Sequence, residues 1–389
     1  MIDTPKPGTA MANHTTVDGW SDRWGALGVA GLALLVYGLT LTPDLSWANA
    51  ATDGGELITA SATLGIPHPP GYPTYVVLGK LFSLLPWGTI AFRYNLFSAV
   101  CVAAAAGVLM PAIHTIYPSV RLPAAVAAAL LFAFAPLVWS QAVIAEVYGL
   151  NLLLLAFFLL LWSRRGASPA AGLALGLAIT AHLTSLFFLP ALLISSRRQA
   201  WRSAAGVLLG LTPLLLLPLF AIGDSPIVWG KPTNAAGWWQ LVSGRLYAAN
   251  FQPARVLEQL PRLLSAIAFG PALLAGTARL SAPATRTLTD RPTGRRLAAT
   301  ALLYAAFALT YATPDAAVVL LPALLLLAVL VAPALNRLGW AALLLPLALL
   351  LLGYPARDLS EQPGPRAAAE RRSEEHTSEL PSRPHLVCR

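Results

Sequence analysis

Charged side chains are scarce in this chain. Of its 389 residues only 11% are Asp, Glu, Lys or Arg, whereas 57% are hydrophobic. A soluble domain contains about 25% charged residues, so this scarcity excludes an ordinary soluble protein and predicts an integral membrane protein. The two cysteines, Cys101 inside an apolar run and Cys388 at the extreme end, exclude a disulfide framework.

Motifs that would reveal a bound group are missing too. The sequence has no cluster with metal-ligand spacing, no glycine loop that would hold a phosphate and no nucleotide fingerprint. We therefore expect neither a metal nor a cofactor. The formal net charge of +9 would suggest a nucleic-acid partner in a soluble protein. In a membrane protein the excess of Lys and Arg in cytoplasmic loops explains it, so we expect a lipid bilayer as partner and no nucleic acid.

Long apolar runs dominate what is present. Several approach the roughly 20 residues that a membrane-spanning helix needs. The sequence therefore predicts an all-α polytopic membrane protein with about eleven transmembrane helices. The predicted segments are 24–42, 93–116, 122–140, 147–162, 169–182, 183–196, 203–221, 261–280, 297–312, 315–334 and 337–353.

The distribution of charge predicts the orientation of these segments. With the N-terminus in the cytoplasm, arginines gather in the inner loops and carboxylates in the outer loops, as the positive-inside rule requires. This topology holds only if residues 72–86 do not cross the membrane. That run is short and interrupted by Lys80, so we expect a helix lying in the outer interface. The outer carboxylates are Asp44, Asp53, Glu56, Glu146, Asp224, Glu258 and Asp315.

The predicted organisation is a single membrane domain. We expect a cytoplasmic N-terminal tail at 1–23, a transmembrane domain at 24–355 and the start of a truncated outer C-terminal region at 356–371. Residues 372–389 are abruptly polar and resemble the translation of a sequencing adapter, so we expect a non-native tail there. The location expected is a bacterial inner membrane, with the site facing the exterior.

The stretch "TDGGELITASATLGIPHPPGYP", residues 52–73, is the most unusual in the chain. Asp53 followed by Glu56 matches a capping box that begins a short helix, and Gly65 would stop that helix. A carboxylate close to the bilayer is also a candidate for function, because it is costly unless it faces water or a polar cavity. Spacing leaves both interpretations open, and a cap that fixes a carboxylate is compatible with catalysis.

Further polar residues fall in the same predicted outer layer. His68 lies in a proline-rich bend and could carry a proton or bind a phosphate; the alternative is an ordinary loop histidine. The outer cations break the charge bias and suggest an anionic ligand, although any one of them could be an interfacial side chain. The candidate binding residues are His68, Tyr72, Lys80, Arg93, Glu146, His182, Lys231 and Arg245.

Residues 42–82, "TPDLSWANAATDGGELITASATLGIPHPPGYPTYVVLGKLF", resemble a known family. They are similar to the GT-C superfamily of glycosyltransferases that use polyprenyl-phosphate sugars, and in particular to its protein O-mannosyltransferase-like branch. Its members share a carboxylate pair, a Leu-Gly step and His-Pro-Pro-Gly-Tyr-Pro. In this chain Gly54 and Gly55 follow Asp53, where relatives more often have Ser or Cys. Supporting matches are "AEVYGLN" at 145–151, "GLALGLAITAHLTSLFFLP" at 172–190, "WGKPT" at 229–233, "GRLY" at 244–247 and "YATPD" at 311–315.

The resemblance implies a GT-C-type bundle with juxtamembrane helices in the first outer loop. It implies transfer of a hexose, with mannose expected, from a polyprenyl-phosphate donor to a hydroxyl of an exported protein or a glycan, with inversion. Asp53 would be the general base and Glu56 would position the acceptor or be the base itself. Lys80, Arg93, His182, Lys231 and Arg245 are candidates to stabilise the leaving phosphate.

Two other classes of function compete with this one. A transporter or lipid-linked-sugar flippase would show inverted repeats and charges near the midplane, and the sequence shows neither. A non-catalytic assembly partner would use the outer loops only as a binding surface.

Overall fold

The computed structural model describes residues 19–193, 196–266, 292–362 and 364. Within these ranges the chain is helical, and β-structure is limited to two isolated bridges. The all-α prediction is therefore confirmed. The predicted tail at 372–389 and most of the predicted span at 261–280 lie outside the described residues. The predicted N-terminal tail overlaps the first helix, which begins at Gly19.

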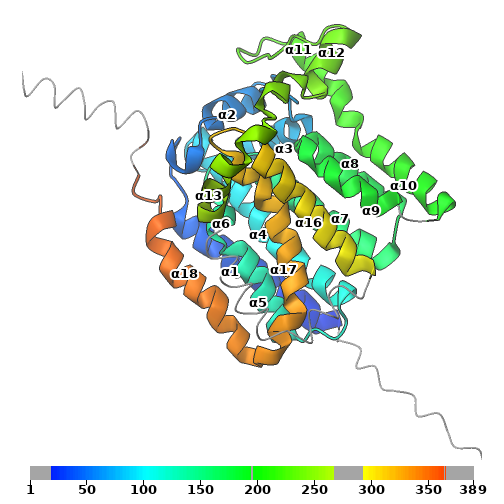
Figure 1. Cartoon of the computed structure of the whole chain (residues 1–389). Coiled ribbons are helices and arrows are strands. Elements are labelled where there is room, and N and C mark those ends of the chain that lie inside the picture. The colour runs from blue at the N-terminus through cyan, green and yellow to red at the C-terminus, as the bar shows by residue number, and fades with distance from the viewer. Residues whose placement is uncertain (1–18, 194–195, 267–291, 363, 365–389) are drawn as a thin grey trace, which may run out of the picture.

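The described helices follow one another with short connections, and several are joined end to end through 3-10 turns (Figure 1). The α-helices are α1 (Gly19–Thr40), α2 (Gly54–Ala62), α3 (Pro73–Ser83), α4 (Ile90–Ile116), α5 (Leu122–Ala133), α6 (Pro136–Ala142), α7 (Tyr148–Arg165), α8 (Pro169–Ala181), α9 (Leu189–Leu193), α10 (Arg197–Gly210), α11 (Leu217–Ala221), α12 (Ala235–Val242), α13 (Val256–Ala266), α16 (Pro292–Thr310), α17 (Leu321–Leu335) and α18 (Leu344–Arg357). The 3-10 helices are η1 (Ala48–Ala50), η2 (Leu183–Phe188), η3 (Thr212–Leu216), η4 (Arg245–Asn250), η5 (Pro253–Arg255), η6 (Ala316–Leu320) and η7 (Asn336–Leu343).

Five helical segments of the described chain are long and apolar enough to cross a membrane, and six if the bent pair α5 and α6 forms one span. The expected count of about eleven is not confirmed. One reason is that α8 has only 13 residues, fewer than a span needs. Another is that the two predicted spans at 315–334 and 337–353 lie in one apolar run, which a non-helical Gly339 breaks within η7. The chain is an integral membrane protein.

Helix α4 is one of the two most buried of the long apolar segments in the described chain. In its most apolar window 72% of the residues are buried inside the protein, against 78% for Ala316–Arg357, 28% for α1 and 22% for the segment that contains α10. Small residues let the helices approach closely, as is usual in membranes: a side chain at Gly107 of α4 would touch the backbone of Ala26 in α1. Some buried polar groups are paired across the bundle: the indole of Trp139 donates to the hydroxyl of Thr40 at 2.9 Å.

Helices α8 and α10 pack closely against each other through glycines. Gly172 and Gly176 of α8 face Gly206 and Gly210 of α10, and a Cβ at any of the four would collide with backbone of the opposite helix. Helices in a membrane attract one another by close van der Waals packing, so glycines stand at such an interface in place of large side chains. From α10 the chain continues through η3 and α11 to residues 222–255, which we call the outer lobe after the side of the membrane that the sequence predicts for it.

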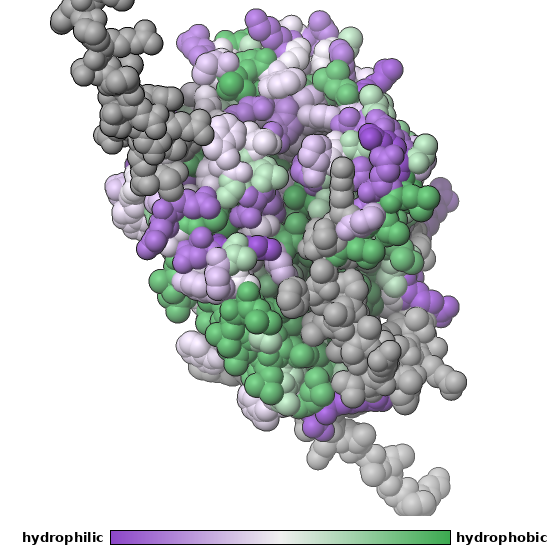
Figure 2. All heavy atoms as spheres, turned by 60° about the vertical axis from the view of Figure 1, so that its left-hand side comes forward, coloured by the Kyte–Doolittle hydropathy of each residue, from purple (hydrophilic) through white to green (hydrophobic). Residues whose placement is uncertain are grey.

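The two ends of the bundle differ in chemistry. Helices α2, α3, α11 and α12 gather at the upper end in Figure 1. Figure 2 shows hydrophobic surface in the lower half of one face and mainly hydrophilic surface above it. With 9 and 11 residues, α2 and α3 are too short to span a bilayer, as expected for 72–86. Because α4 begins beside α3 and runs down the bundle, its last residues lie at the opposite end.

Candidate active site

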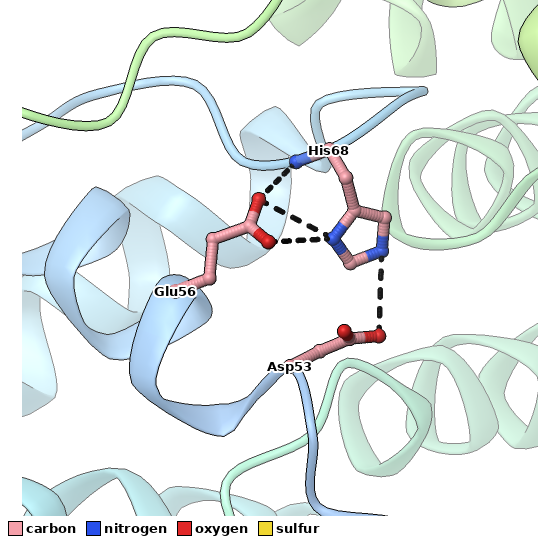
Figure 3. A group of neighbouring side chains, drawn as sticks. All are labelled: Asp53, Glu56 and His68. Carbon is pink, nitrogen blue, oxygen red and sulfur yellow. Dashed lines mark hydrogen bonds and ion pairs between the residues drawn. The ribbon is translucent and has the colours of Figure 1, made fainter.

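The N-terminus of α2 carries both candidate carboxylates. Asp53 occupies the N-cap position of this helix, but its side chain makes no capping hydrogen bond. The capping-box interpretation is therefore wrong. The two side chains turn instead toward the proline-rich bend, where His68 offers a stronger partner than a helix terminus (Figure 3). The helix itself is anchored by Leu57 and Ile58, which are buried against α3, α4 and α7.

Glu56 holds His68 at two points. Its Oε1 accepts the backbone N–H of His68 at 2.5 Å, and its Oε2 lies 3.4 Å from the ring Nδ1 (Figure 3). The opposite ring nitrogen, Nε2, lies 3.8 Å from Oδ2 of Asp53 and 3.0 Å from the hydroxyl of Tyr72. The imidazole thus lies between two carboxylates, fixed by Glu56 on one side and facing Asp53 on the other.

The two carboxylates differ in exposure and in proton affinity. The side chain of Asp53 is 44% exposed and that of Glu56 is 21% exposed. Burial raises the pKa of Asp53, Glu56 and Asp315 raise it further, and His68 opposes them. Burial also acts to raise the pKa of Glu56, but hydrogen bonds from His68 and from the Trp229 side chain outweigh it and lower that pKa. Asp53 is therefore the stronger base, and its more exposed carboxylate is accessible to a substrate.

Gly65, in the Leu-Gly step after α2, does not have the predicted role of a helix stop. Leu64, not Gly65, takes the left-handed conformation that ends the helix, with φ of 53°. Gly65 is needed because a Cβ there would collide with Ser225 and with the carbonyl of Ile227. The close approach forms a short parallel bridge: Ile66 N–H donates to Ile227 at 2.8 Å, and Trp229 N–H donates to Ile66 at 3.0 Å. The outer lobe is thereby fixed beside His68.

Aromatic rings and a buried acid form the inner wall. The ring of His182, where α8 ends, stacks on Tyr72 with centroids 6.2 Å apart and lies 5.2 Å from Tyr148 of α7. Its Nδ1 is 2.8 Å from the hydroxyl of Thr184. Glu146 lies in the connection before α7, where Ser98 binds both its backbone N–H and its carbonyl. Burial raises the pKa of Glu146 well above its usual range, and Asp53 and Asp315 raise it further.

Three further residues act on the site although they were not among the predicted site residues. Asp315 follows α16 and acts electrostatically on Asp53 and Glu146. Trp229 lowers the pKa of Glu56. Burial raises the pKa of Tyr247 in η4, and Tyr311, Asp53, Glu56 and Asp315 raise it further. The sequence signal that could have identified them is their position in the family-like motifs "YATPD", "WGKPT" and "GRLY".

The four predicted cations divide into two pairs. Lys80 Nζ donates to the carbonyl of Ala62 at 2.6 Å, and the guanidinium of Arg93 donates to the carbonyls of Ser83, Trp87 and Gly88. These two complete the C-terminal ends of α2 and α3. Lys231 and Arg245 are exposed and have no polar side-chain partner among the described residues. Their phosphate-binding role stays a prediction, as it does for Lys80 and Arg93.

Asp53, Glu56 and His68 have the composition of a metal site. One ligand atom from each lies within 4.8 Å of the others, and imidazole with carboxylates suits several divalent ions. The geometry also works without an ion, because Glu56 is already bound to His68 by hydrogen bonds. The chemistry considered below uses the side chains themselves.

Part of the chain, including Asp53, Glu56 and His68, is similar to a known family domain. Residues 53–204 match the model of the protein O-mannosyl-transferase TMEM260 N-terminal domain. The chain is 35% identical to protein O-mannosyl-transferase TMEM260 of Mus musculus over 148 residues, which are 38% of the chain and 20% of that protein. It is 26% identical to the Dictyostelium discoideum protein of that name over 238 residues, 52% of the chain and 28% of that protein. The aligned region thus spans less than a third of either relative.

The fold has a solved counterpart. The structure superposes on ArnT from Cupriavidus metallidurans bound to undecaprenyl phosphate, with a TM-score of 0.56 and 18% identity, over 87% of this chain and 64% of ArnT. This similarity shows the fold. Together with the family match, it confirms the predicted resemblance to the GT-C superfamily and its O-mannosyltransferase-like branch.

The contact at Gly65 generates a test of the site's construction. We expect Gly65→Ala to separate Ile66 from Ile227, because the added methyl group collides with backbone that cannot move cheaply. Hydrogen exchange of the Ile66 and Trp229 amides should then accelerate by more than about tenfold. The matched control is Gly55→Ala, where the nearest atom to a new Cβ is 3.8 Å away and protection should be unchanged. Equal protection in Gly65→Ala would show that the bridge does not depend on this glycine.

Proposed function

We propose that this protein is a membrane glycosyltransferase, from its match to the O-mannosyl-transferase domain and its ArnT-like fold. It moves a hexose, mannose by analogy with the named relatives, from a polyprenyl-phosphate donor to a hydroxyl of an exported protein or glycan. The observation that carries the proposal is Asp53, a partly exposed carboxylate of raised pKa held beside a fixed histidine. A lipid-linked donor is supported by the ligand of the ArnT structure, undecaprenyl phosphate.

Asp53 acts as the general base in this proposal. Its partly exposed carboxylate takes the proton from the acceptor hydroxyl as the hydroxyl oxygen attacks the anomeric carbon, and the bond between this carbon and the phosphate oxygen breaks. The electron pair leaves with the polyprenyl phosphate. A single displacement of this kind inverts the anomeric centre. Base catalysis contributes about 10²- to 10⁴-fold in rate.

Glu56 has a positioning role. Both of its oxygens are directed to His68, and hydrogen bonds from His68 and Trp229 stabilise its ionised form. A carboxylate so engaged is a weak base and has little freedom to reach an acceptor. By fixing the His68 ring at Nδ1, Glu56 determines that Nε2 faces Asp53. Glu146, buried and therefore favoured in its neutral form, can donate a hydrogen bond to a sugar hydroxyl.

Lys231 and Arg245 are the best-placed cations for the donor phosphate. Each follows or precedes a side chain of the site by two residues. Lys231 is two residues after Trp229, which lowers the pKa of Glu56. Arg245 is two residues before Tyr247, whose pKa the site carboxylates raise. Fixed positive charge stabilises the phosphate as it gains charge on leaving. The other pair, Lys80 and Arg93, already binds backbone carbonyls.

The proposed location is the outer face of the membrane, on the positive-inside distribution of charge. The bacterial inner membrane expected from the sequence stays a prediction, since the sequence relatives are from Mus musculus and Dictyostelium discoideum.

Substitution of the two carboxylates tests their division of labour. Asp53→Asn should lower kcat by about 10²- to 10⁴-fold. Glu56→Gln should cost less, on the order of 10- to 100-fold, because it loosens His68 without removing the base. The measurement is transfer from a labelled polyprenyl-phosphate mannose to an acceptor peptide by the purified chain. Asp44→Asn is the control, since Asp44 lies in the same loop but binds Leu45 and Thr89. A larger loss in Glu56→Gln than in Asp53→Asn would reverse the assignment.

The cations are tested through the affinity for donor. Lys231→Gln and Arg245→Gln should each raise KM for the polyprenyl-phosphate sugar by about tenfold, since each removes a charge-assisted contact to phosphate. Arg255→Gln should leave KM unchanged, because Arg255 is paired with Glu258 at 2.9 Å. If Lys80→Gln alone raises KM while the other two variants do not, the donor phosphate is bound at α3 instead.

A further inference from the structure

A polar cavity lies at the end of the bundle opposite the candidate active site. Its volume is about 530 Å³. The helix ends that form it belong to four elements: the last residues of α4, the turn after α7, the start of α10 and the start of α16. The described residues that line it are Thr115, Ile116, Trp162, Ser163, Gly166, Ala167, Ser196, Gln199, Thr293 and Arg296.

The unused polar groups in this cavity are mainly hydrogen-bond donors. The hydroxyls of Thr115 and Ser163 donate to carbonyls of their own helices, at 2.8 and 3.0 Å. The half-buried guanidinium of Arg296 and the hydroxyl of Thr293 have no partner among the described residues, and neither has the amide nitrogen of the exposed Gln199, whose oxygen accepts from Ser196 at 3.1 Å. Donors without acceptors indicate a ligand that supplies acceptor oxygens.

The surroundings of the cavity are strongly positive. Exposed arginines flank it at the end of α7, at the start of α10 and in α16, and none of them forms an ion pair within the described part of the chain. In that part the one carboxylate at this end is Asp22, which is bound to His114 at 2.7 Å. The flanking arginines are Arg164, Arg165, Arg197, Arg198, Arg202 and Arg295.

The positive-inside rule accounts for arginines in loops, but it does not account for a polar cavity among helix ends. Basic cavities between membrane helices on the cytoplasmic side bind lipid phosphate groups. Phosphate oxygens accept several hydrogen bonds at once, and arginine binds them in a forked geometry. A lipid headgroup can enter a cavity at the helix ends without leaving its bilayer, whereas a soluble anion must be taken from water.

We propose that this cavity is a binding site for the phosphate headgroup of an anionic phospholipid, separate from the site at Asp53. Arg296 binds the phosphate, and Thr293 and Gln199 donate to its free oxygens. The flanking arginines favour a lipid of net negative charge over a zwitterionic one. The site requires no glycosyl transfer, so its test is independent of the proposed function.

Native mass spectrometry of the purified full chain in an uncharged detergent tests the site. The probes are phosphatidylglycerol, phosphatidylcholine and inorganic phosphate. The wild type should bind phosphatidylglycerol about tenfold more tightly than phosphatidylcholine, the effect of one charge-assisted contact. Arg296→Gln should abolish that preference, and Thr293→Ala, which removes one uncharged donor, should reduce it by about threefold.

The control is Arg121→Gln, an exposed arginine at the same end that does not line the cavity. It should keep the preference, and a thermal melt establishes that each variant is folded. Equal losses in Arg121→Gln and Arg296→Gln would show a diffuse effect of surface charge and overturn the proposal. Displacement of phosphatidylglycerol by millimolar inorganic phosphate would overturn the assignment to a lipid, as would wild-type preference in both Arg296→Gln and Thr293→Ala.

Discussion

The contact between Glu56 and His68 is the interaction on which the outer site depends. It joins the first turn of α2 to the proline-rich bend, so that the two carboxylates and the imidazole have fixed relative positions. The neighbouring contacts of the site are made by residues close to Glu56 and His68 in the chain. Ile66, two residues earlier, holds the outer lobe by a β-bridge, and Trp229 of that lobe returns to Glu56. Tyr72, four residues after His68, connects the joint to His182 and so to α8.

The membrane explains why this chemistry gathers at one end. A bundle whose helices face lipid can carry charged groups only beyond the apolar region or in shielded positions. The structure uses both solutions. Asp53 is partly exposed at the upper end, while Glu146 is buried against α4 by contacts of its backbone with Ser98. The difference in environment separates the pKa values of carboxylates that act on one another, which is how sites assign acid and base roles.

Local sequence was informative where local physics decides the structure. The apolar runs predicted the helices, the break at Lys80 predicted a short α3, and "HPPGYP" marked the site.

The capping-box prediction failed because spacing cannot reveal a partner twelve residues away that binds Glu56 better than a helix terminus does. Gly65 was assigned to a helix stop because the segment that presses on it, around Ser225 and Ile227, is distant in sequence. Asp315 was placed on the outer side by charge, but only the tertiary fold brings it near Asp53. The predicted number of spans is not confirmed, because bent and short helices share the composition of spanning ones and part of the chain lies outside the described residues.

The pH dependence of kcat/KM for sugar transfer tests the central claim most directly, because its acid limb reports the pKa of the base in the free enzyme. The structure raises the pKa of Asp53 and lowers that of Glu56. A base must be ionised, so activity is lost as pH falls through its pKa. The account predicts an acid limb above about 3.9, the ordinary value for Asp, that persists in Glu56→Gln. An acid limb below about 4.3, the ordinary value for Glu, that disappears in Glu56→Gln would identify Glu56 as the base and contradict the account.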